Sequence, residues 1–169
     1  VLGQPAHQRG WLLAHDTDQL PPDLAAALKL LAQRRLKGEP LAYLTGHKEF
    51  FGLDLRVDAR VLVPRPDTET LVNWALAVLT TAPHAPAEGD AAQANTDQKD
   101  TLQALPLAHV DPTVRPRVLD LGTGSGAIAL ALKASHPDLQ VHAIDFSHDA
   151  LAVAQANAQH LKLPVQFAH

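Results

Sequence analysis

The sequence predicts an α/β fold, in which helices pack on a parallel β-sheet. From residue 117 to 169, short apolar segments alternate with helical patterns in the order strand, helix, strand, helix, strand. A turn with glycine at every second position joins the first strand to the first helix. The strands are apolar over almost their whole length, which suits burial on both faces of the sheet. This order favours right-handed crossovers and the opening half of a Rossmann-like domain.

Residues 1–45 are predicted to form part of a small N-terminal helical domain. The stretch PPDLAAALKLLAQRRLKGEP places Leu24, Leu28 and Leu31 at helical spacing, with prolines at its start and Gly38 near its end. A shorter candidate helix lies in RGWLLAHDTDQL. Because so short a segment buries little apolar surface, we expect it to depend on packing against the rest of the chain for stability.

Residues 46–64 are expected to form a β-hairpin linker. Phe50 and Phe51 precede a glycine, and apolar residues alternate with polar ones from residue 53 to residue 57. This alternation favours a hairpin, and the apolar residues that follow favour one more short strand.

The α/β domain itself is expected from 65 to 169 and opens with a helix in RPDTETLVNWALAVL. Asp67 or Thr68 can accept N–H groups at the start of this helix, and Glu69 lies in its first turn. The inward face is predicted from the apolar repeat of Leu71, Ala75 and Leu79.

Between residues 81 and 116 the composition changes. This stretch is rich in alanine and proline, carries several acidic residues and contains no aromatic residue. A segment of this kind buries too little apolar surface to form a core. We therefore predict a disordered insertion at 81–116 within the α/β domain.

Charge and composition exclude several classes of protein. The formal net charge of -4 gives no reason to expect a basic face, and with it no direct binding to nucleic acid or to a membrane surface. No apolar run reaches the ~20 residues of a membrane-spanning helix. Cysteine is absent and the ten histidines do not pair at metal-ligand spacing, so we expect no metal and no disulfide, and a cytoplasmic protein. The lack of methionine and the strand-like end LPVQFAH suggest a fragment cut at both ends.

The turn in VLDLGTGSGAIAL carries the strongest indication of function. Gly122, Gly124 and Gly126 remove side chains and permit positive φ, and the helix that follows presents free N–H groups. In a parallel sheet the ligand binds beyond the carboxyl ends of the strands, where this turn lies. Asp120 lies two positions before the turn, where it can reach a cationic amino group. Asp145 closes the second strand, where a carboxylate can accept both hydroxyls of a ribose.

Three explanations of this turn compete. The first is a structural turn beside two acids that cap helices or lie on the surface. The second is a dinucleotide site, since Gly122, Gly124 and Ala127 fit the degenerate G-x-G-x-x-A pattern. The third is a site for S-adenosyl-L-methionine. We favour S-adenosyl-L-methionine as the cofactor, because Asp120 repels a pyrophosphate, whereas one acid for an ammonium and another for a ribose suit this donor.

Longer stretches of the chain resemble a known family. GEPLAYLTGHKEFFGLDLRVDARVLVPRPDTETLV, from Gly38 to Val72, together with VLDLGTGSGAIALAL, is similar to the bacterial release factor glutamine methyltransferases, which are protein-(glutamine-N5) methyltransferases. The resemblance runs through nearly the whole chain apart from the insertion. It implies a class I S-adenosylmethionine-dependent methyltransferase domain of Rossmann-like fold, preceded by a helical domain and a hairpin linker. It further implies that the side-chain nitrogen of the glutamine in the Gly-Gly-Gln motif of peptide chain release factors is methylated. Those factors are then the partners, and translation termination is modulated.

The resemblance also implies which residues act. The glycine loop and Asp145 match the cofactor contacts of the family, so the candidate cofactor-binding residues are Asp120, Gly122, Thr123, Gly124, Ser125, Gly126 and Asp145. The catalytic Asn-Pro-Pro-Tyr motif of the family follows the fourth strand, and we expect it beyond His169. The catalytic residues are therefore left unassigned.

A second match to the family has a simpler competing explanation. Arg65, Pro66, Thr68 and Glu69 fit its R-P-x-T-E element. A proline followed by Asp, Thr and Glu is also a common helix start, so capping alone explains these residues equally well. The functional interpretation adds that Arg65 and Glu69 line the rim where the substrate glutamine enters.

Other activities stay open at this point. The same cofactor can serve methylation of a ribosomal-protein glutamine or of an exocyclic base amine, and a non-catalytic binding module is a further alternative. The N-terminal helices favour the release factor, because base-modifying relatives typically add a basic surface that this chain lacks.

Overall fold

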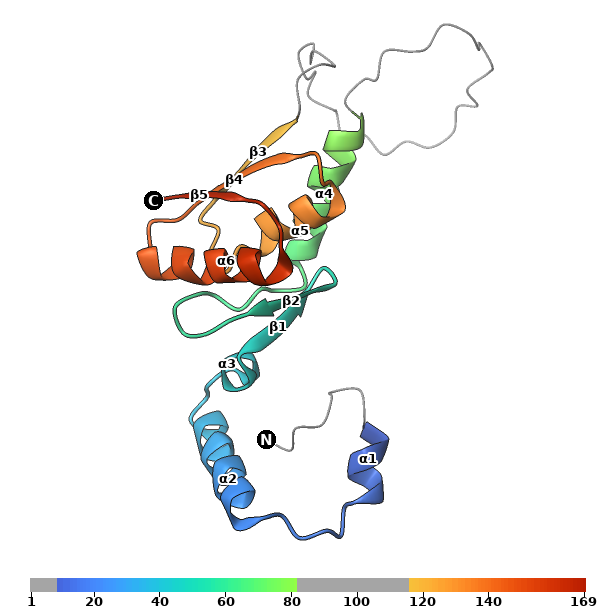
Figure 1. Cartoon of the computed structure of the whole chain (residues 1–169), viewed down its shortest axis with the longest axis vertical. Helices are drawn as coiled ribbons and strands as arrows, with labels where there is room; N and C mark the ends of the chain where they lie inside the picture. The colour runs from blue at the N-terminus through green and yellow to red at the C-terminus, as the bar shows by residue number, and fades with distance from the viewer. Residues whose placement is uncertain (1–8, 82–115) are drawn as a thin grey trace, which may run out of the picture. The chain divides into compact units, whose positions relative to one another are not determined.

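The structure, a computed structural model, describes residues 9–81 and 116–169 (Figure 1). The insertion predicted at 81–116 lies outside the described residues except for its two end positions. The chain divides into two compact units, Val1–Gly46 and His47–His169, and the hairpin belongs to the second unit. In the described part of the chain, no helix is both long and apolar enough to cross a membrane.

The described part of the first unit consists of helices α1 (Arg9–Ala14), α2 (Pro22–Leu36) and α3 (Leu41–Thr45). α2 begins with a proline, as predicted, because the first turn of a helix does not use that N–H group. No residue of α2 is buried, and Leu28, on its predicted apolar face, is 47% exposed. The sequence does not predict α3, because five residues are too few to show a helical repeat.

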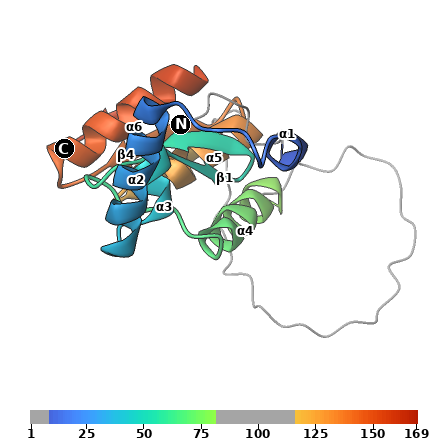
Figure 2. The same cartoon turned by 90° about the horizontal axis from the view of Figure 1, so that it is seen from below.

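The predicted hairpin consists of β1 (His47–Phe50) and β2 (Leu53–Arg56), which pair antiparallel. Phe50 and Leu55 are almost completely buried and belong to the main core. β2 lies beside the long helix near the C-terminus, α6 (His148–Leu161) (Figure 2). The hairpin therefore packs against the α/β domain and shares its core.

The short strand predicted after the hairpin does not form. Residues 57–67 contain no strand, yet Val57 and Val61 are buried. Between them the Asp58 carboxylate accepts the N–H of Arg60 at 3.0 Å, and the Asp58 carbonyl accepts the N–H of Val61 at 3.1 Å. This local turn bends the chain. The apolar residues thus reach the core as loop side chains, which the alternating pattern does not distinguish from a strand.

α4 (Thr68–Thr81) begins within the predicted stretch and ends two residues beyond it. Of the three residues predicted to face inward, Ala75 and Leu79 pack against the core, whereas Leu71 does not. Val72 is fully buried, whereas Leu71 is 48% exposed. Ala75, Leu76 and Leu79 pack beside Val72 against the core. The helical repeat alone fits a face that starts at either residue 71 or residue 72. Packing against the sheet domain selects the second.

Within residues 116–169, the sheet has three parallel strands, β3 (Arg117–Leu121), β4 (Gln140–Ile144) and β5 (Gln166–Ala168), in the order β3-β4-β5. α5 (Ala127–Ser135) connects β3 to β4, and α6 connects β4 to β5. The predicted alternation of strands and helices is confirmed. Because the strands are parallel, the turns that follow β3 and β4 lie at the same edge of the sheet.

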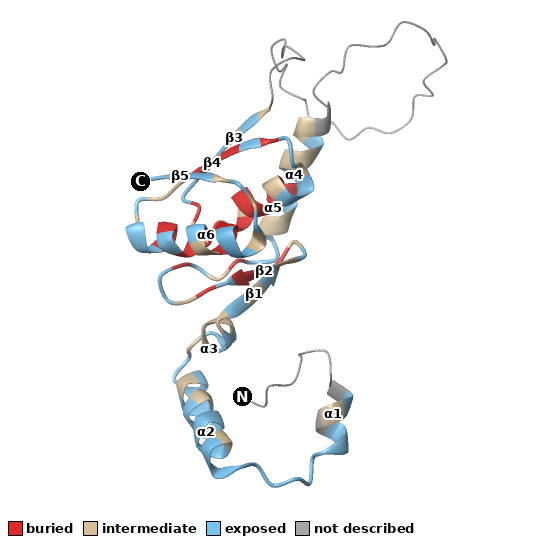
Figure 3. Cartoon of the chain, in the orientation of Figure 1, coloured by how far each residue is buried: buried red, intermediate tan, exposed pale blue. Residues whose placement is uncertain are grey.

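Helices cover one face of this sheet (Figure 3). Val141 and Ala143 of β4 are buried in one cluster with Leu130 and Leu132 of α5 and with Ala158 of α6. Both connecting helices therefore pack on the same side.

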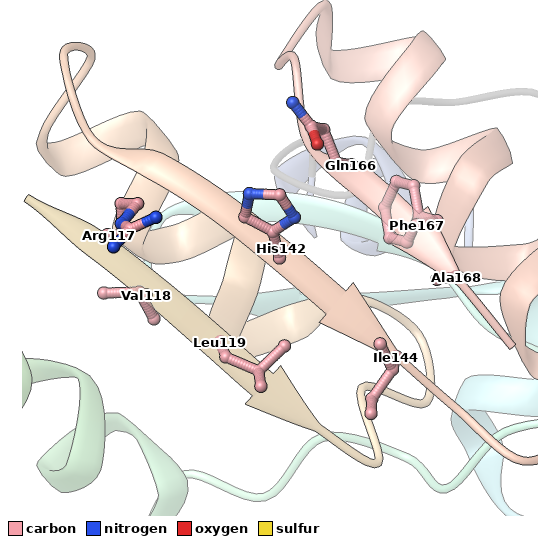
Figure 4. A pocket seen from close by; sticks show the side chains of 8 residues that line it. All are labelled: Arg117, Val118, Leu119, His142, Ile144, Gln166, Phe167 and Ala168. Carbon is pink, nitrogen blue, oxygen red and sulfur yellow. The ribbon is translucent and has the colours of Figure 1, made fainter.

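The opposite face of the sheet is open among the described residues. Leu119 and Leu121 are 56% and 69% exposed, and a hollow of about 430 Å³ follows this face, with His142 and Ile144 in its lining (Figure 4). The prediction that both faces are buried is thus wrong for the described residues of the second unit, because none of the helices of that unit packs there. The hollow follows the face of the strands, whereas the predicted site lies at their carboxyl ends.

Candidate functional site

The glycine loop between β3 and α5 has a backbone that glycine favours at three positions. Gly122, Gly124 and Gly126 have φ of +74°, +55° and +83°. A Cβ atom added at Gly122 or Gly124 would meet no other atom within 4 Å, so open space lies beside both. At Gly126 it would approach Leu130 Cδ1 to 3.0 Å. The first two glycines therefore leave bare backbone beside open space, and the third allows the loop to pack closely against the protein.

The two side chains between these glycines point inward. Thr123 and Ser125 are only 6% and 3% exposed. The Thr123 hydroxyl donates to the Asp120 carboxylate at 2.7 Å. We expect these two residues to offer a ligand their backbone alone, because their side chains are buried in the fold.

The loop is attached to the neighbouring strand by backbone hydrogen bonds. The N–H groups of Gly122 and Thr123 donate to the carbonyl of Ile144, at 2.9 and 3.0 Å. Ile144 is the last residue of β4, directly before Asp145. The loop and this acid, which are predicted to act together, thus meet at the carboxyl edge of the sheet.

Asp120 is a buried acid, at 8% exposure. Burial raises its pKa above the ordinary carboxyl value, and the negative charge of Asp145 acts in the same direction. Hydrogen bonds from the Thr123 hydroxyl and the Ala129 backbone N–H oppose this shift without cancelling it. A cation near Asp120 would stabilise its charged form. Contact with the amino group of a ligand stays a prediction.

Asp145 is held from two sides. Its Oδ2 accepts the N–H of Gly124 at 2.8 Å, and its Oδ1 accepts the N–H of Ser147 at 2.9 Å. Ser147 in turn caps α6, where its hydroxyl accepts the N–H of Ala150 at 3.2 Å. The carboxylate therefore has a fixed position, and each oxygen still has a lone pair for a further donor. Its contact with a ribose stays a prediction.

An aromatic residue that sequence reasoning missed lies next to this acid. Phe146 follows Asp145 directly and is 94% exposed. Its ring lies 5.9 Å from that of His169. A flat apolar ring beside the expected ribose position suits stacking of a base. The available signal was an aromatic residue immediately after the acid that ends the strand.

Glu69 is brought to the hairpin turn. The turn residues Phe51 and Gly52 have φ of +51° and +75°, as a type I′ turn requires. The Glu69 carboxylate accepts the N–H of Phe51 at 3.1 Å, and the Glu49 carboxylate accepts that of Gly52 at 2.7 Å. Arg65 is exposed. Glu69 therefore tethers α4 to the hairpin, while the predicted role of both residues at a substrate rim stays a prediction.

No metal centre is found in the parts of the chain that the structure describes. Across residues 9–81 and 116–169, no three His, Cys, Asp or Glu side chains gather in a way that could hold a metal ion.

Comparison with known proteins finds a match for each of the two parts of the chain. Residues 95–169 match the methyltransferase small domain, and residues 6–46 match the PrmC N-terminal domain. A release factor glutamine methyltransferase of Bordetella pertussis is 46% identical over 95% of this chain, which covers 47% of that protein. Its counterpart from Escherichia coli is 41% identical over 92% of this chain, which covers 44% of that protein.

Solved structures with a shared segment include an S-adenosylmethionine-dependent methyltransferase from Geobacter sulfurreducens in complex with S-adenosyl-L-homocysteine. It is 35% identical over 33% of this chain and 24% of its own, with a TM-score of 0.30. S-adenosyl-L-methionine, the cofactor predicted from the sequence, is the cofactor of the methyltransferase domain that the chain matches. The chain spans about half the length of the curated relatives it matches. Along nearly its whole length, the chain is similar to the release factor glutamine methyltransferases.

Proposed function

We propose that the complete protein transfers a methyl group from S-adenosyl-L-methionine to the side-chain nitrogen (N5) of the glutamine in the Gly-Gly-Gln motif of peptide chain release factors. The observation that carries the proposal is the 46% identity to a release factor glutamine methyltransferase over 95% of the chain. Both the helical unit and the sheet unit contain a match to a domain model. Since release factors act on ribosomes, the proposed location is the cytoplasm, and the proposed consequence is an effect on translation termination.

The donor is proposed to bind at the glycine loop. The space beside Gly122 and Gly124 leaves room for the methionine part of the donor against bare backbone. Asp120, an acid whose pKa is raised by burial, is proposed to attract the ammonium group, whose positive charge would stabilise the carboxylate. Asp145, which is fixed by two backbone N–H groups, is proposed to accept the ribose hydroxyls. These residues fit the donor better than a dinucleotide, whose pyrophosphate would face two acids.

The chemistry explains why positioning matters more than a strong base. When bound, the donor supplies an electrophilic methyl group on a sulfonium. The acceptor is a carboxamide nitrogen, whose lone pair is delocalised into its carbonyl, so it reacts only when it is well aligned. Alignment of two reactants in one site can contribute ~7–11 kcal/mol to lowering a barrier. The loop residues are proposed to contribute the donor half of this alignment. Arg65, with an exposed guanidinium, is proposed to meet the substrate.

The test uses the complete protein, a labelled methyl donor and a release factor. We expect label on the wild-type release factor and none on a variant in which the glutamine of the Gly-Gly-Gln motif is replaced. Transfer to the replaced variant at the same rate would move the acceptor elsewhere, and absence of transfer to either would overturn the proposal. A ribosomal-protein preparation in a parallel reaction separates the two glutamine acceptors.

A further inference from the structure

Asn157 is the largest fully buried polar side chain among the described residues, at 0% exposure, and no part of the proposed site includes it. It lies in the middle of α6, on the inward face that also carries Ala150, Ala154 and Ala158. An amide in such a place is costly unless all its hydrogen-bonding groups find partners. The hydrogen-bond partners of Asn157 therefore indicate which parts of the fold its side chain connects.

The carboxamide of Asn157 joins the hairpin to the glycine loop. Its Nδ2 donates to the carbonyl of Ser125 at 2.9 Å and to the carbonyl of Arg56 at 3.0 Å. Its Oδ1 accepts the N–H of Arg56 at 2.8 Å. The amide cannot be turned over, because Oδ1 would then face two carbonyl oxygens and Nδ2 would face an N–H. Both donors and the acceptor are thus satisfied by backbone groups of two segments far apart in the sequence.

On the loop side, Asn157 fixes one peptide plane. The carbonyl of that plane belongs to Ser125 and is held by Asn157, and its N–H belongs to Gly126 and donates to the carbonyl of Thr123 at 2.8 Å. The flanking residues Gly124 and Gly126 both have positive φ, a backbone conformation that residues with a side chain rarely adopt. One side chain therefore restrains a peptide plane of the loop at which the donor is proposed to bind.

On the hairpin side, Asn157 binds both backbone groups of Arg56, as a neighbouring strand would. The hairpin turn is bonded in addition to Glu69 on α4. Hydrogen bonds thus attach the hairpin to the helix that follows Arg65 at one point, and through Asn157 to the loop at another. A single side chain of α6 therefore connects the hairpin with the loop.

We propose that Asn157 is a positioning residue for the methyl donor: its carboxamide fixes the Ser125 carbonyl, and with it the loop conformation that binds the donor, and couples that loop to the hairpin. This inference rests on the proposed function. It predicts that loss of the carboxamide weakens donor binding itself, beyond any loss of folding stability.

The first experiment compares Asn157→Ala with Val153→Ala in the complete protein. Val153 lies on the same helix and is also buried, but it has no polar side chain with which to bond the loop. Calorimetric titration with S-adenosyl-L-homocysteine gives the affinity, and thermal unfolding without ligand gives the stability. We expect Asn157→Ala to raise the Kd about tenfold, as the loss of one such hydrogen bond implies. Val153→Ala should lower the Tm while its Kd stays within about twofold of wild type.

A second measurement needs no variant and covers the case in which Asn157→Ala does not fold. In the wild-type protein, binding of S-adenosyl-L-homocysteine should shift the side-chain NH₂ resonances of Asn157 and the backbone amide resonance of Arg56. Unchanged resonances at saturation, or an Asn157→Ala variant that binds the ligand like wild type, would overturn the inference while the proposed function stands. If wild type itself does not bind the ligand, the proposed function fails and the inference fails with it.

Discussion

The Asp145 carboxylate accepts the backbone N–H of Gly124 at 2.8 Å, so an acid at the end of β4 holds the turn that follows β3. Its second oxygen accepts the N–H of Ser147 at the start of α6. Asp145 therefore holds the loop in place, and it is also the residue predicted to contact the ribose. Both roles require an acidic residue at the carboxyl end of the second strand of the sheet.

Replacement of Asp145 should weaken donor binding strongly. Asp145→Ala removes both the anchor of Gly124 and the proposed acceptor of the ribose hydroxyls, so we expect the Kd for S-adenosyl-L-methionine to rise at least about tenfold. Titration calorimetry measures this. Asp149→Ala is the matched control, since Asp149 is an exposed acid in the first turn of α6. An unchanged Kd for Asp145→Ala would remove Asp145 from the site.

Asp120→Asn should stabilise the folded protein at high pH and weaken the binding of the donor. Because burial raises the pKa of Asp120, the folded state retains this proton to a higher pH than the unfolded chain. The free energy of unfolding therefore falls as pH rises from the ordinary carboxyl pKa of ~4 through the raised value. The neutral variant lacks this fall. Thermal unfolding of both proteins over a pH series should show the variant gaining Tm relative to wild type as pH rises, and a difference that is constant with pH would contradict the burial argument.

Alanine at two loop glycines should separate backbone strain from packing. Gly122→Ala places a residue with a Cβ at φ +74° beside open space, which costs about 1–2 kcal/mol. Gly126→Ala adds a contact of 3.0 Å with Leu130 and one of 3.3 Å with Ala154, so a further ~1–3 kcal/mol is expected. Denaturant unfolding of the two variants provides the comparison. Equal stabilities would mean that α5 and α6 adjust freely around the loop.

Glu69→Ala should lower stability, because it leaves the N–H of Phe51 without its acceptor. We expect a loss of about 1 kcal/mol in the free energy of unfolding. Glu69→Gln retains an acceptor oxygen and should stay close to wild type in stability. If Glu69→Ala unfolds like wild type but loses methyl transfer, the tether is unimportant and the rim interpretation is the better one.

The elements with a clear repeat or a clear boundary could be predicted from the sequence. α5, α6 and the three strands between Arg117 and Ala168 follow from alternating apolar segments, and α2 follows from its prolines and its leucine repeat. The stretch around Val57 and Val61 could not, because burial without strand pairing leaves the same alternating pattern. Similarly, the choice between Leu71 and Val72 as the inward residue depends on what α4 packs against.

The candidate site was predictable where its residues lie on short segments. The glycines follow one strand and Asp145 follows the next, so parallel pairing of the two strands is enough to bring them together. The partners of Glu69 and Asn157 were not predictable, because they bond backbone groups 18 and 101 residues away. The only signal was an asparagine among alanines on the apolar face of α6, and this pattern does not indicate which backbone groups the side chain bonds.

A structure of the complete protein with S-adenosyl-L-homocysteine tests the central claim most directly. We predict that the amino-acid part of the ligand lies against the backbone of Gly122 and Gly124, with the ribose hydroxyls donating to the Asp145 carboxylate. A ligand bound at any other place on the sheet domain, or a ribose that does not touch Asp145, would contradict the assignment of this loop as the donor site.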